Sequence, residues 1–246
     1  MTNIKLSPRM QAIADMANGK IVADIGCDHA FVSIYLVKEK GFDRALAMDV
    51  KKGPLEIAKK NINLYGLGDK IDIRLSNGFE KLKPMEADTA VIAGMGGALM
   101  VDILKNGKVH TDNKIKLILQ PQSEPEKVRK YLSDINYVII DESMLIDEDK
   151  YYTVIKAVTY EDFKGEAING DESLNASYSE YELLYGRILI KKKDDILKQY
   201  LEERIEKNAK LIDALKKAGT ENALEKQSEL EHENIIINQA LEIIKR

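Results

Sequence analysis

The sequence predicts an α/β protein: a mostly parallel, seven-stranded β-sheet that ends in a β-hairpin, followed by an antiparallel, coiled-coil-like helical hairpin. Two features carry this prediction. From Lys20 to about Thr159, short runs rich in β-branched residues alternate with amphipathic stretches, as is typical of βαβ units. From about Tyr178 to Arg246 the chain is charged, helix-forming and almost free of strand signals. We therefore expect two domains, residues 1–162 and 163–246.

The first five expected strands are apolar runs, each with the length of a buried strand. They cover residues 21–26, 44–50, 70–75, 88–94 and 115–120. Between them, apolar residues at three- and four-residue spacing predict crossover helices at residues 31–41, 54–66, 97–107 and 124–135. Gly41, Gly66 and Gly107 follow the last periodic residue of three of these helices, where a left-handed stop belongs.

The alternation changes after the fifth strand. Two β-rich runs, residues 137–146 and 151–160, are joined only by the segment Asp-Glu-Asp-Lys. A connection this short predicts an antiparallel hairpin and excludes a crossover. Five βα units closed by a hairpin are typical of Rossmann-like class I methyltransferases, whereas the sheets of nucleotide-cofactor dehydrogenases usually continue with parallel strands.

The C-terminal region predicts two long helices that break at Gly219-Thr220, where the glycine can end one helix and the threonine can cap the next. Apolar stripes run along both helices and would pack against each other. The stripe residues are Leu197, Leu201, Ile205, Ile212 and Leu215 in the first helix, and Leu230, Asn234, Ile237, Leu241 and Ile244 in the second. Asn234 either fixes the register of this seam or marks the point where it opens.

Composition excludes several classes of protein. The formal net charge of -4 and the pI near 5.6 argue against nonspecific nucleic-acid coating, without excluding local basic patches such as Lys191-Lys192-Lys193. Cys27 is the single cysteine, so an intrachain disulfide is impossible and a cysteine-based metal site is not expected. No run approaches the roughly 20 apolar residues that span a bilayer, and the first residues do not resemble a signal peptide. We expect a cytoplasmic, monomeric protein without a metal.

The first strand runs into Ala-Asp-Ile-Gly-Cys-Asp-His-Ala, residues 23–30, where Gly26 permits a sharp turn beneath a ligand. A dinucleotide site would need several glycines around its pyrophosphate, whereas S-adenosylmethionine has no phosphate. One glycine flanked by acids therefore favours S-adenosylmethionine, although an ordinary strand-to-helix turn would also explain the segment. His29 could stack on or orient a base, or serve as a structural hydrogen-bond partner.

Two further strand ends would complete a cofactor site. Asp49 ends the second strand about 25 positions after Asp24, where an acid can accept both ribose hydroxyls of an adenosine. The alternative for Asp49 is a helix cap. Asn77 and Gly78 follow the third strand, where adenine's exocyclic amine is usually received, and the alternative there is a simple turn.

The fourth strand runs into Ala-Gly-Met-Gly-Gly, residues 93–97, which predicts a flat backbone shelf for the substrate near the switch point of the sheet. The alternative is tight packing between helix and strand. Gln120-Pro121-Gln122 follows the fifth strand and could present an amide to a base edge.

Five segments, in this order and spacing, resemble the bacterial TrmK family of tRNA (adenine-22) 1-methyltransferases. They are SPRM (7–10), DIGCDHA (24–30), IAGMGGALM (92–100), LILQPQ (117–122) and DKYYTVIKA (149–157). The resemblance implies a Rossmann-like methyltransferase domain, S-adenosyl-L-methionine as methyl donor, and tRNA as substrate. It places cofactor contacts at Asp24, Gly26, His29, Asp49, Asn77, Gly78, Gly94 and Met95. Cys27 stands where small polar residues are common in the family, and Asp49 where glutamate also occurs.

Methylation of adenine N1 needs no strong base, because a lone pair of the ring attacks the sulfonium methyl directly, so positioning carries most of the catalysis. The expected catalytic set stabilises the charge that develops on the base and orients the base: Asp28, His29, Gly94, Met95, Gly96 and Gln120, with Tyr152 as a further stacking candidate. Arg9 and Cys27 join the expected cofactor-binding residues, Cys27 as a small buried side chain and not as a nucleophile. Arg9 would bind the methionine carboxylate or a phosphate, unless it forms a surface ion pair.

Two other functions remain open from the sequence. One is a methyltransferase of the same fold that acts on a small molecule or a protein, with the helical hairpin as a lid or dimer element. The other is a noncatalytic RNA- or protein-binding module on a degenerate fold, which the acids and glycines at Asp24, Gly26, Asp49 and Gly94 count against. If the substrate is tRNA, the helical hairpin is expected to contact it far from the target base, with Lys191, Lys192 and Lys193 as the first candidates.

Overall fold

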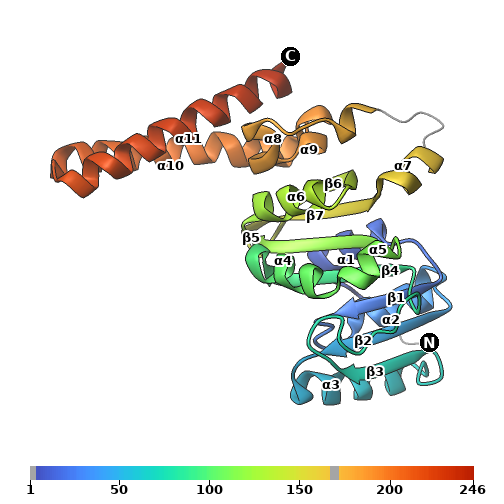
Figure 1. The fold of residues 1–246 in the computed structure, drawn as a ribbon. Helices are drawn as coiled ribbons and strands as arrows, with labels where there is room; N and C mark the ends of the chain where they lie inside the picture. Colours follow the sequence, from blue (N-terminus) through green and yellow to red (C-terminus); the bar gives the residue numbers. More distant parts are fainter. Residues whose placement is uncertain (1–3, 167–171) are drawn as a thin grey trace. The chain divides into compact units, whose positions relative to one another are not determined.

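The computed structural model describes residues 4–166 and 172–246. The chain divides between Ala176 and Ser177 into two compact units. The first unit holds a seven-stranded sheet with the order β3-β2-β1-β4-β5-β7-β6 (Figure 1). Its strands are β1 (Ile21–Ile25), β2 (Arg44–Asp49), β3 (Ile71–Leu75), β4 (Thr89–Gly96), β5 (Lys116–Ser123), β6 (Tyr137–Asp147) and β7 (Lys150–Thr159). Each agrees with a predicted strand to within a few residues.

The sheet is parallel from β3 to β5, and β7 then pairs antiparallel with both β5 and β6. The turn between β6 and β7 places Glu148 and Asp149 at positive φ, 48° and 58°, which gives a two-residue turn the twist that a hairpin needs. The predicted class, a parallel sheet closed by a hairpin, is confirmed.

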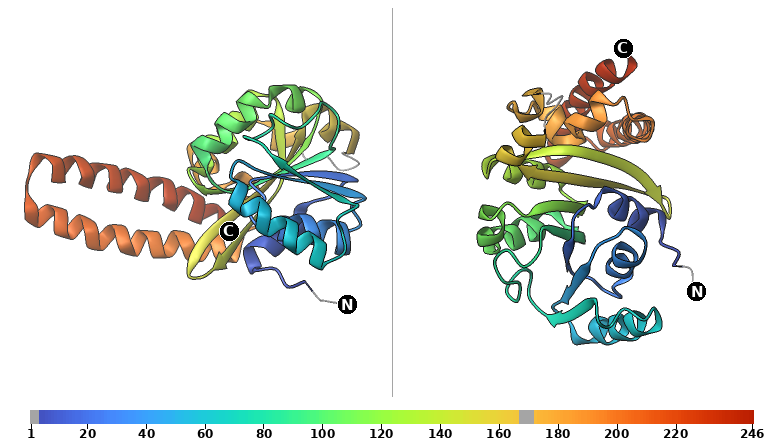
Figure 2. Two further views of the ribbon diagram at one scale, coloured as in Figure 1. Left: turned by 90° about the horizontal axis from the view of Figure 1, so that it is seen from below. Right: turned by 90° about the vertical axis from the view of Figure 1, so that its right-hand side faces the viewer.

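Helices cover both faces of this sheet. They are α1 (Pro8–Met16), α2 (Phe31–Glu39), α3 (Lys52–Leu64), α4 (Gly97–Asn106), α5 (Lys108–Asp112), α6 (Pro125–Asp134) and α7 (Tyr160–Glu166), with a short 3₁₀ turn η1 (Glu172–Asn175). The strand order runs outward from β1 to β3 and then restarts at β4 in the other direction. With right-handed crossovers, this reversal puts α2 and α3 on one face and α4 and α6 on the other (Figure 2, right).

Two details of the first unit differ from expectation. Gly41 and Gly66 have positive φ, as predicted, but Gly107 does not, with φ at -90°. Its small size matters instead because a Cβ there would lie 2.2 Å from the ring of Phe79. The short elements α1, α5, α7 and η1 had no predicted counterpart.

The boundary between the units also lies later than residue 162. Phe163 is buried and packs with Val138 and Val158 of the terminal hairpin, and Leu174 packs on the same cluster. These contacts attach α7 and η1 to the sheet, so the segment after residue 162 continues the first unit.

The second unit contains α8 (Glu180–Tyr185), α9 (Arg187–Lys191), α10 (Asp195–Ala218) and α11 (Glu221–Lys245). Gly219 ends α10 at φ 61°, and the Thr220 hydroxyl caps α11 by accepting from the Ala223 N–H at 3.3 Å, as predicted. Most residues of each apolar stripe are buried, and α10 packs against α11. No described helix is long and apolar enough to cross a membrane.

Asn234 lies on the α10–α11 seam and makes a specific polar contact there. Its Oδ1 accepts from Asn208 Nδ2 at 2.9 Å, and the same amide nitrogen lies 3.2 Å from the Glu233 carboxylate. Asn208 is 3% exposed, so this polar contact is enclosed between the helices. A buried amide pair stabilises only the register that brings both partners together, which supports the register-fixing alternative for Asn234.

Candidate active site

A cavity of about 270 Å³ lies at the carboxyl ends of β1 and β4, where the strand order reverses. This is the position at which open α/β sheets bind ligands. Seven predicted residues line it: Arg9, Asp24, Gly26, Cys27, Asp28, Gly94 and Gln120. The lining also includes Ala93 and Gln122, from the predicted shelf and amide segments, and four apolar residues that were not predicted: Met10, Ile13, Val32 and Val91. The topology thus brings together motifs that are far apart in the sequence.

Asp24 is the most deeply buried acid of the cavity, with 4% of its surface exposed. Burial raises the pKa of its carboxyl to about 6, and the nearby Asp49 and Asp28 carboxylates add to the rise. Hydrogen bonds from Ser33, including one from its hydroxyl at 2.6 Å, oppose it. Ser33 lies on α2 and was not a predicted site residue, because a serine inside a helical stretch gives no signal in sequence. The cavity is therefore lined by a carboxyl that binds a proton more readily than a solvent-exposed aspartate does.

Asp49 lies at the end of β2, beside the turn that follows β1. Its two oxygens accept from the backbone N–H groups of Lys51, at 2.8 Å, and Asp28, at 3.3 Å. The Asp49 side chain does not cap α3, whose N-cap residue is Lys51. Each carboxylate oxygen retains a second lone pair, so two hydroxyl donors can still be accepted. These backbone bonds hold the carboxylate in a fixed orientation.

Cys27 and His29 have different surroundings. Burial, reinforced by Asp24, Asp49 and Asp28, raises the pKa of the Cys27 thiol, so the sulfur stays protonated and is not a nucleophile. The His29 side chain is 40% exposed, with Nε2 3.5 Å from an Asp28 oxygen. Its ring does not line the cavity, so it remains a candidate for contact with a larger substrate.

Both the backbone conformation at position 26 and the neighbouring Met95 side chain favour glycine there. Its φ is 75°, and a Cβ would lie 2.3 Å from the Met95 Cε atom. Met95 therefore covers the turn after β1 and does not line the cavity itself. This contact links the first motif to the shelf at the end of β4.

The glycines of the shelf have separate roles, and the packing alternative holds for one of them. At Gly97, a Cβ would lie 2.3 Å from the Glu124 carbonyl oxygen, so this glycine allows α4 to approach the backbone before α6. Gly94 has φ 76° and lines the cavity, with only the Gln122 and Arg9 side chains near its missing Cβ. At Gly96 the nearest atom is the Ser123 hydroxyl, 3.1 Å away, and Gly96 does not line the cavity.

Arg9 reaches the cavity from the first turn of α1, which Pro8 and the capping Ser7 hydroxyl start. Its guanidinium lies 5.2 Å from the centre of the Tyr152 ring and 3.5 Å from Gln120 Oε1. Arg9 thus belongs to a cluster over the cavity and forms no surface ion pair through its guanidinium in the part of the chain described.

Asn77 and Gly78 follow β3 and do not line the cavity. The Asn77 amide donates to Glu80 at 3.1 Å, and Gly78 has φ 56°, which gives this segment the form of a turn. The turn nevertheless adjoins Asp49, since the Ser76 N–H donates to the Asp49 carbonyl at 2.9 Å. An adenosine that contacts Asp49 would find this turn beside it.

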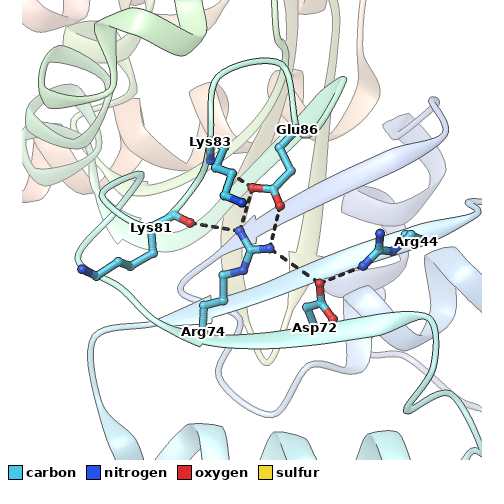
Figure 3. Close-up of polar contacts among 6 residues, drawn as sticks. All are labelled: Arg44, Asp72, Arg74, Lys81, Lys83 and Glu86. Carbon is cyan, nitrogen blue, oxygen red and sulfur yellow. Dashed lines mark hydrogen bonds and ion pairs between the residues drawn. The ribbon is translucent and has the colours of Figure 1, made fainter.

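A network around Arg74 secures the segment that leads from this turn to β4 (Figure 3). The Arg74 guanidinium forms two hydrogen bonds with the Glu86 carboxylate, at 2.6 and 2.7 Å, and one with the Lys81 carbonyl at 2.9 Å. Asp72 lies 3.5 Å from Arg74 and accepts from Arg44 at 2.9 Å. The bonds from Arg74 lower the pKa of Glu86 to about 2. Sequence reasoning missed this network, because its members lie on three segments with no common motif.

The acids around the cavity do not form a metal site: among residues 4–166 and 172–246, no group of three or more His, Cys, Asp or Glu side chains could hold an ion. Three carboxylates near a neutral thiol and an exposed backbone shelf instead suit a cationic organic ligand. Phosphates at the same place would meet Asp24, Asp28 and Asp49, which disfavours a dinucleotide.

Known proteins share this fold and are similar to this chain in sequence. A family model described as a methyltransferase domain matches residues 6–155. The tRNA (adenine(22)-N(1))-methyltransferase of Bacillus subtilis is 33% identical over 232 residues, which cover 94% of each chain. The crystal structure of the B. subtilis M1A22 tRNA methyltransferase TrmK matches with a TM-score of 0.82 and 31% identity, over 97% of this chain and 99% of that one. Streptococcus pneumoniae Sp1610 in complex with S-adenosyl-L-methionine matches with a TM-score of 0.80 and 28% identity, over 96% and 100%. On this similarity, which spans both units, the chain belongs to the tRNA (adenine-22) N1-methyltransferase family.

Proposed function

We propose that this protein transfers a methyl group from S-adenosyl-L-methionine to ring nitrogen 1 of adenine 22 in tRNA. The observation that carries the proposal is the acidic cavity at the carboxyl ends of β1 and β4, in a chain that is 33% identical to a tRNA (adenine(22)-N(1))-methyltransferase over 232 residues. A protein or small-molecule substrate has no comparable support, since the similarity to a tRNA methyltransferase extends over 94% of the chain.

The residues of the cavity fit this methyl donor. Its ammonium and sulfonium groups are cations, and Asp24 and Asp28 supply carboxylates on the cavity wall. Its ribose presents two hydroxyl donors, and Asp49 presents an oriented carboxylate at the neighbouring strand end. Arg9 is the cation of the cavity and is suited to the methionine carboxylate.

The reaction does not require the protein to remove a proton before the methyl group is transferred, because the attacking nitrogen already carries a lone pair. S-adenosyl-L-methionine supplies an electrophilic methyl group whose sulfonium charge passes to the base, so the overall charge is conserved. The chain's contribution is to hold the base at the shelf with N1 directed at the cavity, to exclude water, and to present acceptors to the developing cation. Asp28 and Gly94 line the cavity where these acceptors are needed.

The direct test is mass mapping of tRNA after incubation with the enzyme and S-adenosyl-L-methionine. We expect one methyl group at N1 of adenine 22. The matched variant is Asp49→Ala, which should weaken cofactor binding by about 1–3 kcal/mol because the ribose hydroxyls lose their acceptor. Asp69→Ala, a change at an exposed aspartate before β3, is the control and should bind normally. Unchanged cofactor affinity in Asp49→Ala would contradict the assignment of Asp49, and an unmodified tRNA would contradict the proposed reaction.

We also propose that the second unit, from Ser177 onward, binds parts of the tRNA other than the target base. Lysines recur along α10, and Lys207, Lys210, Lys216 and Lys217 are exposed there. Lysine side chains can bind phosphates of the tRNA backbone, and such contacts orient the substrate without depending on its base sequence. A chain that ends at Ala176 should bind S-adenosyl-L-methionine but lose most of its tRNA affinity in a gel-shift titration. Equal tRNA affinity of both chains would point to a role in stability or association.

A further inference from the structure

The segment Gln120-Pro121-Gln122 was expected to present an amide to the target base, but the hydrogen bonds of Gln120 are directed inward. Gln120 is 0% exposed at the end of β5. Its Oε1 accepts from the Gly94 N–H at 3.2 Å and faces Arg9 Nη1 at 3.5 Å, and its Nε2 donates to the Pro121 carbonyl at 3.0 Å. Both lone pairs of the oxygen are therefore directed at protein donors. Gln120 can hold the shelf in place, but it cannot offer its oxygen to a substrate.

Gln122 follows two positions later and differs in each of these respects. It is exposed, and it lines the same cavity. Its Nε2 lies 3.8 Å from the position of a Cβ on Gly94, which places the amide directly over the shelf. Among the hydrogen bonds found for residues 4–166 and 172–246, none engages its side chain, so either end of the amide can turn toward a ligand.

The edge of adenine decides which group is needed there. N1 must keep its lone pair for the methyl group, so the protein can hold this edge only through the neighbouring exocyclic amine, which donates hydrogen bonds. The required partner is an acceptor on the substrate side of Gly94. Asp28 also lines the cavity, but it lies at the turn after β1, and its carboxylate is 3.5 Å from His29 Nε2. Gln122 lies beside Gly94, and no hydrogen bond found among the described residues engages its amide, so its Oε1 can supply this acceptor.

We propose that Gln122 reads the target base: its Oε1 accepts a hydrogen bond from the exocyclic amine of the adenine and so directs N1 toward the methyl group. Gln120 and Arg9 act as positioning residues, because they hold the Gly94 backbone against which the base lies. This inference rests on the proposed function and adds to it the group that recognises adenine.

The test is a cycle of two changes, one in the full-length enzyme and one in the tRNA. The enzyme change is Gln122→Met, which keeps the length of the side chain and removes the amide. The tRNA change replaces the target adenine by purine, which keeps N1 and lacks only the exocyclic amine. Single-turnover methylation is measured for all four combinations, and S-adenosyl-L-methionine affinity is measured for both enzymes.

We expect Gln122→Met to lower kcat/KM on adenine tRNA by about 10- to 100-fold, the usual effect of losing one well-placed hydrogen bond. On purine tRNA the variant and the native enzyme should react at equal rates, because the bond is already absent. Cofactor affinity should not change. Gln122→Glu, which keeps an acceptor, should retain most of the activity on adenine tRNA.

Two outcomes would overturn the inference. If Gln122→Met methylates adenine tRNA as fast as the native enzyme, the side chain does not touch the base. If it loses the same factor on adenine and purine tRNA, its role is independent of the amine. Failure of the proposed function itself is distinguishable, since the native enzyme would then leave adenine tRNA unmodified.

Discussion

Asp24 combines burial with a negative charge, and we expect this combination to lower the stability of the folded protein at neutral pH. A carboxyl with a pKa of about 6 instead of 3.8 costs the folded state about 3 kcal/mol when it is ionised, since each pH unit corresponds to about 1.4 kcal/mol. Asp24→Asn cannot ionise, and its amide oxygen can still accept the Ser33 hydroxyl bond of 2.6 Å. We therefore expect the variant to be more stable than the native protein at neutral pH in the absence of ligand.

The sign of the pH dependence follows from the direction of the pKa change. Because the folded pKa is raised, the folded state binds the proton more readily than the unfolded state, and stability falls as pH rises from about 4 to above 6. The stability gained in Asp24→Asn should thus grow from about 1 kcal/mol at pH 4.5 to about 3 kcal/mol at pH 7.5. Urea unfolding followed by circular dichroism at both pH values measures this difference.

The same charge is expected to serve binding. Asp24→Asn should lose about 10- to 100-fold in S-adenosyl-L-methionine affinity at pH 7.5 by calorimetry, because a cationic ligand loses a buried carboxylate. Asp69→Asn, at an exposed position, controls for the chemical change. A stability difference between Asp24→Asn and the native protein that stays constant from pH 4.5 to 7.5 would refute the electrostatic reasoning. An unchanged affinity would remove Asp24 from the cofactor site.

Three further predictions follow from individual contacts. Gly97→Ala should lower the free energy of unfolding by about 1–3 kcal/mol in a urea titration, because its Cβ would meet the backbone carbonyl of Glu124. In Gly96→Ala the Cβ meets only a serine hydroxyl, so the free energy of unfolding should stay close to that of the native protein. Equal losses in the two variants would contradict the packing role of Gly97. Glu86→Gln should lower the free energy of unfolding by about 1 kcal/mol at pH 7. The native protein should lose stability as pH falls from about 4.5 to 2, because Glu86 becomes protonated, and the variant should lose less over this range. Thermal denaturation at several pH values tests both results. Asn208→Ala should lower the unfolding free energy of the α10–α11 hairpin by about 1–2 kcal/mol, since it leaves the amide of Asn234 without this partner, and an unchanged melting profile would argue against a register-fixing role.

The sequence alone determined the order and type of the main elements. Hydrophobic periodicity is a local property, so strands such as β1 and β4, and the long helices α10 and α11, could be predicted from their own residues. Local turn chemistry was equally informative at Gly219 and Thr220. Five segments, by their order and spacing in the sequence, already indicated the family, and the similarity over 94% of the chain confirms it.

The tertiary structure decided which of these residues act together. Arg9 and Gln120 meet although 111 positions separate them, and Ser33 reaches Asp24 from a helix without any motif. The different surroundings of Gln120, which is buried and hydrogen-bonded, and Gln122, which is exposed, are invisible in the sequence, where they are two glutamines around one proline. An amide is available to a ligand only if no donor or acceptor of the protein lies within about 3 Å of it. For these two glutamines, such distances are fixed only when the sheet, α1 and the shelf have packed together.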